Sequence, residues 1–491
     1  MKRQNYSLLL LLGAVVVLNL PYIPYYSQLS CDTEVYRYIS MVIMKGGVPY
    51  RDVFDHKPPL IYFMSITGLY LGGWLQWLIN TLLAMLATFL FFRLGRKYRL
   101  PYPWLLPLLF NLMLRDFLIF WAGGNTREYT TVLTLIFFCV LMGEQRWRYY
   151  LLGFLAGLIF FFQQDQVLVL FPFFLYAFIR KKDNVSLLHR ILDPAAGALL
   201  VAVPVILYFA WHRSLAPFWR DAFGFNFGWY TSTFKESFGD HLRRVKQFLD
   251  EGNYEVPFLV AVTLGISGLV FRGSNKWLTG ACLAALALSM SAEFMGGRGG
   301  MGIFYYYYLP LSASICILLF AVFVFTEEPF LRERKAMGIF GVLVCTSISY
   351  TFLQHITHLT PRRENKIVAS PELRYLRQHP PAGDYQLYEF GNHNYVCAYN
   401  EFRILAPSGW IYHHFWHYYE NWDKDHAILD SIEQDLLHHR TSYIIDAITD
   451  PAEEFHDPAA YAMWHSFLLE HYQQVPLADT TGVTLWKWKG Q

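Results

Sequence analysis

Two carboxylates lie two residues apart, directly after the first long apolar segment of the chain. Asp32 and Glu34 flank Thr33. In an extended segment, residues two apart point to the same side, so both carboxylates can face one pocket. Such a pair can bind a divalent cation, or one carboxylate can act as a general base while the other orients it. The alternative is local, because Asp32 can also cap a helix that begins near Thr33.

A lysine follows the acidic pair at the start of the second apolar segment. Lys57 stands between His56 and two prolines, and Tyr50 lies a few residues earlier as a candidate substrate contact. Prolines are ordinary at the first turn of a helix, and a lysine at a membrane boundary can simply reach toward water. Held beside a rigid turn and two carboxylates, however, Lys57 can bind a phosphate at the level of the lipid headgroups. Asp55, just before it, can be a turn residue alone.

A third group of charges opens a later apolar segment. The sequence GGNTRE ends in Arg127 and Glu128, with Asn125 or Thr126 as the expected helix cap. Glu128 then complements the helix dipole, or it joins Asp32 and Glu34 while Arg127 meets an anion. Asp116, next to Arg115 in an otherwise apolar stretch, can support the same site, since charged residues inside membranes usually face a cavity or the protein interior.

A glycine-rich turn precedes the last strongly aromatic segment. Arg298 stands among four glycines, which allow backbone N–H groups to approach a phosphate. Four consecutive tyrosines follow, and of these Tyr306 and Tyr307 are candidate substrate contacts. Tyrosines at this place can also be ordinary membrane-interface anchors.

The composition shows what must position these groups. The chain has 491 residues, of which 54% are hydrophobic and 16% charged, whereas soluble domains carry about 25% charged residues. Apolar runs of about 20 residues, enough to cross a bilayer, recur through the first three quarters. We expect about eleven spans, and the first is expected to remain uncleaved. The apolar segments run approximately over 6–26, 60–92, 103–122, 128–143, 149–163, 166–180, 192–212, 255–271, 277–293, 303–325 and 336–353.

Basic residues fix the expected orientation. Alternate connections are rich in Lys and Arg, and short basic loops stay in the cytoplasm. The basic residues are therefore explained by membrane topology, and they do not indicate nucleic-acid binding. This places the N-terminus in the cytoplasm and the candidate site residues on the outer side. Residues 1–354 are expected to form the membrane domain, with 27–59 as its first outer loop, and residues 355–491 a small extracytoplasmic α/β domain.

Secondary structure in the C-terminal region follows from short apolar runs. Tyr385 to Phe390, Tyr443 to Ala447 and Val483 to Trp488 are expected strands, and a polar helix is expected around 424–440. Six cysteines show no metal-ligand spacing. Cys31 and Cys397 fall on the same predicted side, which leaves a disulfide between them open.

Taken together, these patterns resemble the GT-C superfamily of polyprenyl-phosphate-sugar-dependent glycosyltransferases. The chain is similar in particular to bacterial relatives of protein O-mannosyltransferases and of the lipid A aminoarabinose transferase. The acidic site of the second outer loop is reduced here to Glu128. The features that carry the resemblance are the pair Asp32 and Glu34, the run from Gly46 to Asp52 with Lys57 to Leu60, the helix-opening Glu128, and the stretch from Arg298 to Tyr308.

The resemblance implies sugar transfer from a polyprenyl-phosphate donor to an acceptor hydroxyl, with inversion, at the outer face of a bacterial cytoplasmic membrane. Asp32 would be the base and Glu34 would orient it or the substrate. The departing phosphate would be stabilised by Lys57, Arg127 and Arg298. A divalent cation, Mg²⁺ or Mn²⁺, is a candidate cofactor, with Glu128 and Asp116 as candidate ligands.

The acceptor can be a protein, a lipid or a glycan, and the C-terminal domain is expected to influence that choice. Two rival readings remain at this stage. A polytopic lipid or solute transporter, or flippase, would also show many spans and a few interfacial charges. An inactive GT-C-fold assembly partner would tolerate the loss of Asp32.

Overall fold

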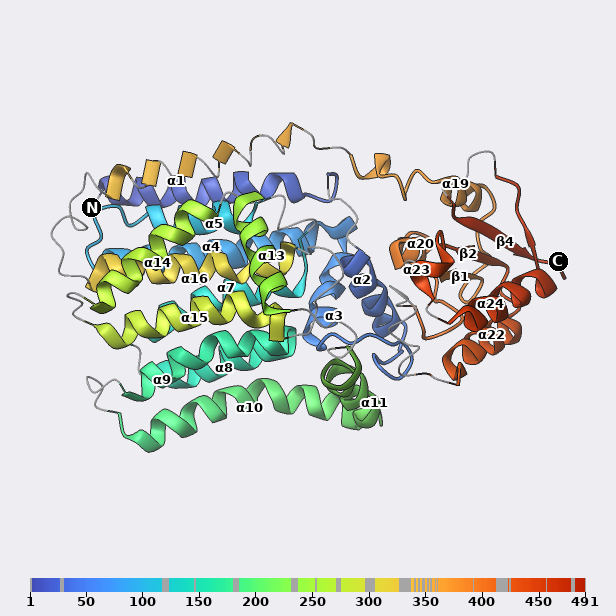
Figure 1. The fold of residues 1–491 in the computed structure, drawn as a ribbon, viewed down its shortest axis with the longest axis horizontal. Coiled ribbons are helices and arrows are strands. Elements are labelled where there is room, and N and C mark those ends of the chain that lie inside the picture. The colour runs from blue at the N-terminus through green and yellow to red at the C-terminus, as the bar shows by residue number, and fades with distance from the viewer. Residues whose placement is uncertain are drawn as a thin grey trace. The chain divides into compact units, whose positions relative to one another are not determined.

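A computed structural model describes most of the chain. The described residues are 2–490 except 27–30, 117–122, 145–146, 180–184, 231–236, 252–253, 271–274, 296–304, 326–336, 340, 343–344, 347–348, 351–352, 354–355, 358, 360, 392, 412–422, 424, 456 and 478–481. The chain is mostly helical and folds as two compact units, each assembled from separate stretches of sequence (Figure 1). The first unit comprises Met1–Ile23, Trp74–Leu207 and Phe234–Leu359, and the second comprises Pro24–Gly73, Tyr208–Thr233 and Thr360–Gln491.

Long apolar helices make up the first unit, and many of them lie side by side (Figure 1). Helix α16 forms the core of this unit, because it contacts α5, α7, α14 and α15. Of an 18-residue apolar stretch within residues 306–325, 89% is buried inside the protein. In helix α10, by contrast, 17% of the corresponding 18-residue apolar stretch is buried. The elements are α1 (Lys2–Asn19), η1 (Leu20–Tyr22), α4 (Trp74–Lys97), α5 (Leu105–Leu114), α7 (Thr126–Leu141), α8 (Arg148–Phe162), η4 (Gln164–Leu170), α9 (Phe171–Ile179), α10 (Leu187–Trp211, whose last residues belong to the second unit), α13 (Phe238–Glu251), α14 (Glu255–Val270), α15 (Lys276–Met295), η6 (Tyr305–Tyr308) and α16 (Pro310–Phe325).

The structure has fewer helices that meet a strict test of length and hydropathy for a membrane span than the sequence suggests. Within the described ranges, three helical stretches are long and apolar enough to cross a membrane, at 71–97, 187–211 and 306–325. A fourth is counted if the bent pair α13 and α14 forms one span. Six further apolar helices are shorter, as α5 with its 10 residues shows. The eleven expected spans are therefore not confirmed, while the helical membrane-protein character is consistent with the structure.

The second unit combines the first outer loop with the C-terminal region. Its sheet has the order β1-β2-β4-β3, with β1 parallel to β2 and the other neighbours antiparallel. Phe390 of β1 stacks on Trp464 with ring centroids 3.9 Å apart in the domain core. The helical elements are α2 (Cys31–Met44), α3 (Leu60–Ser65), η2 (Ile66–Leu69), η3 (Leu71–Gly73), α11 (Leu215–Trp219), η5 (Arg220–Tyr230), η7 (Arg362–Glu364), α19 (Pro371–Gln378), η8 (His393–Val396), α20 (Cys397–Phe402), α22 (Ala427–His439), α23 (Pro451–Glu454) and α24 (Pro458–His471). The strands are β1 (Leu387–Phe390), β2 (Tyr443–Asp446), β3 (Tyr472–Gln474) and β4 (Thr484–Trp488).

The predicted C-terminal α/β domain is confirmed in its elements. The three predicted strands correspond to β1, β2 and β4, and the predicted polar helix corresponds to α22. Strand β3 was not predicted. The linear domain boundary at residue 354/355 stays a prediction, because the compact units are defined by packing rather than by sequence order.

Candidate functional site

A short turn, Asp55-His56-Lys57, is an enclosed polar feature of the loop at 27–59. The exposed fractions of these residues are 1%, 0% and 5%. The Asp55 carboxylate accepts hydrogen bonds at Oδ1 from the backbone N–H of His56 at 2.6 Å and of Lys57 at 3.4 Å. An aspartate that bonds its own following backbone in this way fixes the turn locally. The next residues, Pro58 and Pro59, then lead into α3.

Three side chains hold the same turn through its carbonyl groups. The hydroxyls of Tyr50 and Tyr62 both donate to the Lys57 carbonyl, at 2.6 and 3.0 Å. The amide of Asn226 donates to the His56 carbonyl at 2.6 Å. These bonds fix the backbone from which the Lys57 side chain projects. Tyr50, predicted as a substrate contact, is 3% exposed and uses its hydroxyl on this turn.

The charges around the turn are coupled. The pKa of the Asp55 carboxyl is raised to about 6, because burial outweighs Lys57, Tyr62 and the His56 N–H, which lower the pKa. The charge of Asp32 adds to the rise. Asp55 therefore interacts electrostatically with both residues predicted for the chemistry, the proposed base and the proposed phosphate ligand. Asp32 itself lies in the first turn of α2 and is partly exposed. A buried carboxyl with a pKa shifted toward neutrality, next to a lysine and a second carboxylate, is typical of functional sites.

Glu34 has a different environment from Asp32. It is 2% exposed, and its Oε1 accepts from Arg37 at 3.0 Å and from Arg362 at 2.7 Å. Asn400 donates to its Oε2 at 2.8 Å and to its backbone carbonyl at 2.9 Å. Burial would raise the pKa of this carboxyl, but Arg37, Arg362 and Asn400 outweigh burial and lower it. Glu34 is thus a charged, fully engaged carboxylate.

The premise that the Asp32–Glu34 segment is extended is wrong. Helix α2 begins at Cys31, so Asp32 lies within its first turn rather than at a cap before Thr33. Residues two apart on an α-helix do not face each other. The two carboxylates therefore do not point to one side.

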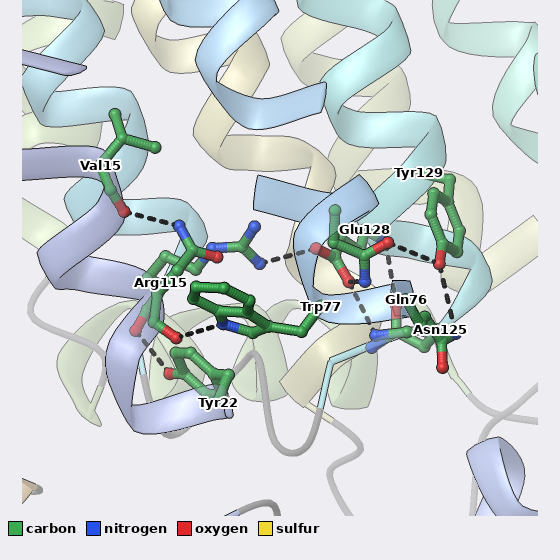
Figure 2. Close-up of polar contacts among 11 residues, drawn as sticks. Val15, Tyr22, Gln76, Trp77, Arg115, Asn125, Glu128 and Tyr129 are labelled. Carbon is green, nitrogen blue, oxygen red and sulfur yellow. Dashed lines mark hydrogen bonds and ion pairs between the residues drawn. The ribbon is translucent and has the colours of Figure 1, made fainter. Parts of the chain in front are cut away.

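Glu128, predicted to join the acidic site, lies in a polar network of the first unit (Figure 2). Its Oε1 accepts from Arg115 at 2.7 Å. Its Oε2 accepts from the backbone of Gly124 at 2.7 Å and from Asn80 at 3.4 Å. Asn125 is the N-cap of α7, accepting from the Glu128 backbone N–H at 2.9 Å, as the sequence predicted. The carboxylate is neutralised by a fully buried arginine.

The network extends to neighbouring elements of the same unit (Figure 2). The Tyr22 hydroxyl donates to the Arg115 carbonyl at 2.8 Å, and the Tyr129 hydroxyl donates to Asn80 at 2.9 Å. Asp116, predicted to support the site, is buried and interacts electrostatically with the Tyr22 hydroxyl. The network joins η1, α4, the C-terminal end of α5 and α7, which is a structural task.

A second ion pair of the first unit contains Arg127. Its guanidinium lies 2.9 Å from Asp165 and 5.1 Å from the centre of the Tyr307 ring. Tyr306 and Tyr307 stack on each other at 4.4 Å. Three predicted residues, Arg127, Tyr306 and Tyr307, are thus brought together, and Asp165 is a partner that the sequence reasoning did not assign. Arg298 lies outside the described residues.

The carboxylates do not fit a divalent cation. Within the described part of the chain, no group of three or more His, Cys, Asp or Glu side chains is arranged to hold a metal ion. Glu128, a candidate ligand together with Asp116, is neutralised by Arg115, and Glu34 of the acidic pair is neutralised by Arg37 and Arg362. No step is therefore assigned to a metal. Cys397 is a free, buried thiol, and the side chain of Cys31 lies outside the described residues.

Comparison with known proteins gives one strong result. Neither a family model nor a curated protein sequence matches this chain. The crystal structure of ArnT from Cupriavidus metallidurans bound to undecaprenyl phosphate does match, with a TM-score of 0.61 over 97% of both chains. The chain has the GT-C fold. The identity to ArnT is 11%, so this likeness confirms the predicted fold, and the activity has to be argued from the residues.

Proposed function

We propose that this protein is a membrane glycosyltransferase that uses a polyprenyl-phosphate-linked sugar and an acceptor hydroxyl. The observation that carries the proposal is the fold shared with ArnT, a protein solved with undecaprenyl phosphate, over 97% of both chains. A second observation supports the proposal: the buried Asp55–Lys57 turn interacts electrostatically with Asp32, the proposed base. A lipid phosphate needs a cation at its oxygens, and an acceptor hydroxyl needs a base.

The proposed reaction is a single displacement. The Asp32 carboxylate takes the proton of the acceptor hydroxyl, and the acceptor oxygen forms a bond to the anomeric carbon. The bond from that carbon to the phosphate oxygen breaks, so the configuration inverts and the polyprenyl phosphate leaves with the electron pair. Lys57, fixed by its turn, stabilises the charge that develops on the phosphate. Arg298 stays predicted as a further phosphate contact, whereas Arg127, which is paired with Asp165, is expected to contribute less than Lys57.

Asp55 has two proposed tasks in this scheme. Its carboxylate bonds the backbone of the turn and so fixes the direction of Lys57. It also interacts electrostatically with Lys57, which lowers the pKa of the Asp55 carboxyl. Sequence reasoning did not separate Asp55 from Asp52, although Asp52 is only part-buried and pairs with the exposed Arg51.

The proposed setting is a bacterial cytoplasmic membrane, with the N-terminus inside and the C-terminal domain outside. The support is the distribution of basic residues, such as Arg96 and Lys97 in the last turn of α4. Basic residues are enriched on the cytoplasmic side of membrane helices. The acceptor is named by chemistry alone, as a hydroxyl on a protein, lipid or glycan.

The test is donor consumption by the purified protein in lipid, using a panel of radiolabelled polyprenyl-phosphate monosaccharides. We expect the wild type to consume one donor and Asp32→Asn to be slower by about 10³-fold, the range for loss of a general base. Asp250→Asn, which changes an exposed carboxylate on α13, is the control and should match the wild type. Equal rates for wild type and Asp32→Asn would remove Asp32 as base. No consumption of any donor by folded, lipid-binding protein would favour a transporter or an inactive partner.

A further inference from the structure

Glu34 connects the first outer loop to two distant parts of the chain within the second unit. Arg362, in η7, lies 328 residues away in sequence and donates to its Oε1 at 2.7 Å. Asn400, in α20, lies 366 residues away and donates both to its Oε2 and to its backbone carbonyl. The side chain and the backbone of one residue in the first turn of α2 are therefore held by the C-terminal region.

These contacts are of the strong kind. The bonds from arginine and amide donors to the ionised carboxylate measure 2.7–3.0 Å, as charge-assisted bonds do. Glu34 is 2% exposed, so solvent screens the ion pairs weakly. Removal of Arg362 or Asn400 takes away one of the donors that balance this buried carboxylate, which is destabilising locally.

Further contacts along the loop hold it against the same region. Helix α2 packs against α20 and η8. The Tyr38 hydroxyl accepts from the backbone N–H of Ala406 at 2.8 Å, and its ring lies 4.9 Å from that of Tyr399. Beyond α2, the Phe54 N–H donates to the Gly409 carbonyl at 2.8 Å. The position and rotation of α2 are thus set by residues of the C-terminal region rather than by the loop alone.

We infer that the C-terminal region, through Arg362 and Asn400 acting on Glu34, positions helix α2 and thereby the Asp32 carboxylate. This inference rests on the proposed function, in which Asp32 is the base. Asp32 lies two residues before Glu34, so a rotation or shift of α2 moves both together. Glu34 is a positioning residue, and the C-terminal region contributes to the chemical step in addition to any part it has in acceptor choice.

The experiment compares Arg362→Met, Glu34→Gln and the double variant with a matched control. Arg377→Gln breaks another arginine–glutamate pair of the same region, in which Arg377 bonds both oxygens of Glu401 at 2.6 and 2.9 Å. Glu401 follows Asn400 in α20, so this variant removes an ion pair of the same helix without removing a partner of Glu34. For each variant, kcat and donor KM are measured per folded molecule, together with hydrogen exchange of the α2 amides. A misplacement of about 1 Å can cost about 100-fold in rate.

For Arg362→Met and Glu34→Gln, we expect kcat to fall about 10- to 100-fold while donor KM changes less than about 3-fold. The α2 amides should exchange faster. The double variant should be no slower than the worse single variant, because both changes break one contact. Arg362→Lys, which keeps the charge, should recover part of kcat, and Arg377→Gln should match the wild type. A purely structural role would lower the amount of folded protein and leave kcat per folded molecule unchanged.

The outcomes separate this inference from the proposed function. If the wild type transfers sugar and Asp32→Asn does not, while Arg362→Met keeps the wild-type kcat, the inference is overturned and the function stands. If no donor is consumed even by the wild type, the function fails. Hydrogen exchange then decides the positioning itself, since unchanged α2 protection in both Arg362→Met and Glu34→Gln would overturn it.

Discussion

Two buried carboxylates, one in each unit, have opposite electrostatic settings. Glu128 of the first unit is matched by the buried Arg115 at 2.7 Å and by backbone and amide donors. Asp55 of the second unit has two backbone donors and the influence of Lys57, yet burial dominates and raises its pKa to about 6. In the sequence the two residues look alike, because Asp55 precedes an apolar segment and Glu128 opens one.

The difference shows how structural charges and chemical charges can be told apart. In the first unit, the predicted site residues Glu128 and Arg127 each have an oppositely charged partner, Arg115 and Asp165. In the second unit, Asp55 retains a desolvation penalty that its neighbours do not remove. A protein keeps a destabilised group mainly where function needs it. On this criterion we place the proposed chemistry in the second unit.

The largest effect is expected from Arg115→Met in the first unit. It leaves the Glu128 carboxylate buried without its arginine, which should cost about 3–5 kcal/mol of unfolding free energy. The measurement is thermal or denaturant unfolding in detergent. The double variant Arg115→Met with Glu128→Gln should be more stable than the single variant, because no lone charge remains. A loss below about 1 kcal/mol would show that the pair is not the structural element that the comparison requires.

The next effect is a gain in stability from Asp55→Asn. The folded pKa of about 6 lies above the ordinary value of 3.8, so the stabilising contribution of the protonated form is present below about pH 4 and is lost as pH rises through 6. Asparagine stays neutral, so the variant should be more stable than wild type by up to about 3 kcal/mol at pH 7. The two proteins should unfold alike at pH 4.

The paired activity measurement completes this test. If Asp55 fixes and balances Lys57, donor turnover by Asp55→Asn should fall even as its melting temperature rises. A variant that is both more stable and fully active would place Asp55 outside the chemistry.

Part of this site was predictable from sequence because it depends on local rules. The Asn125 cap with Glu128 in the first turn, and the place of Lys57 ahead of Pro58 and Pro59, need only neighbouring residues. Local rules do not separate Asp52 from Asp55. The first is exposed and pairs with Arg51, whereas the second is buried, a difference that depends on how the folded chain packs around each residue.

The partners of Glu34 could not be predicted from local rules either. Arg362 and Asn400 lie more than 300 residues away, and no periodicity links them to α2.

The strands of the sheet show the same limit of prediction from local sequence. Strands with apolar or aromatic runs were predicted, but β3, with the sequence YQQ, has no such signal and is defined by pairing with β4. Contacts with other parts of the chain, rather than local propensity, define β3 and the environment of Glu34.

A third prediction sets two cations against each other. Lys57→Met should lower kcat/KM for the donor about 100-fold, the usual effect of losing one transition-state contact. Arg127→Met should lower it less than about 3-fold, because the charge of Arg127 is already balanced by Asp165. Steady-state kinetics with the donor found for the wild type give both values. An equal loss in the two variants would assign Arg127 to the phosphate as well and would break the contrast between the units.

The smallest predicted effect concerns the hydroxyls that hold the turn. Tyr62→Phe removes one donor from the Lys57 carbonyl while the Tyr50 hydroxyl still bonds it at 2.6 Å. Since a typical hydrogen bond contributes about 1 kcal/mol, we expect a loss of stability of that order and a fall in kcat/KM of about 5-fold. Tyr254→Phe is the matched change in the first unit, where the hydroxyl donates to the Met113 carbonyl at 2.5 Å. It should cost similar stability and leave kcat/KM unchanged. Equal kinetic losses in both variants would mean that Tyr62 acts through general stability, and that the rigid turn does not set the position of Lys57.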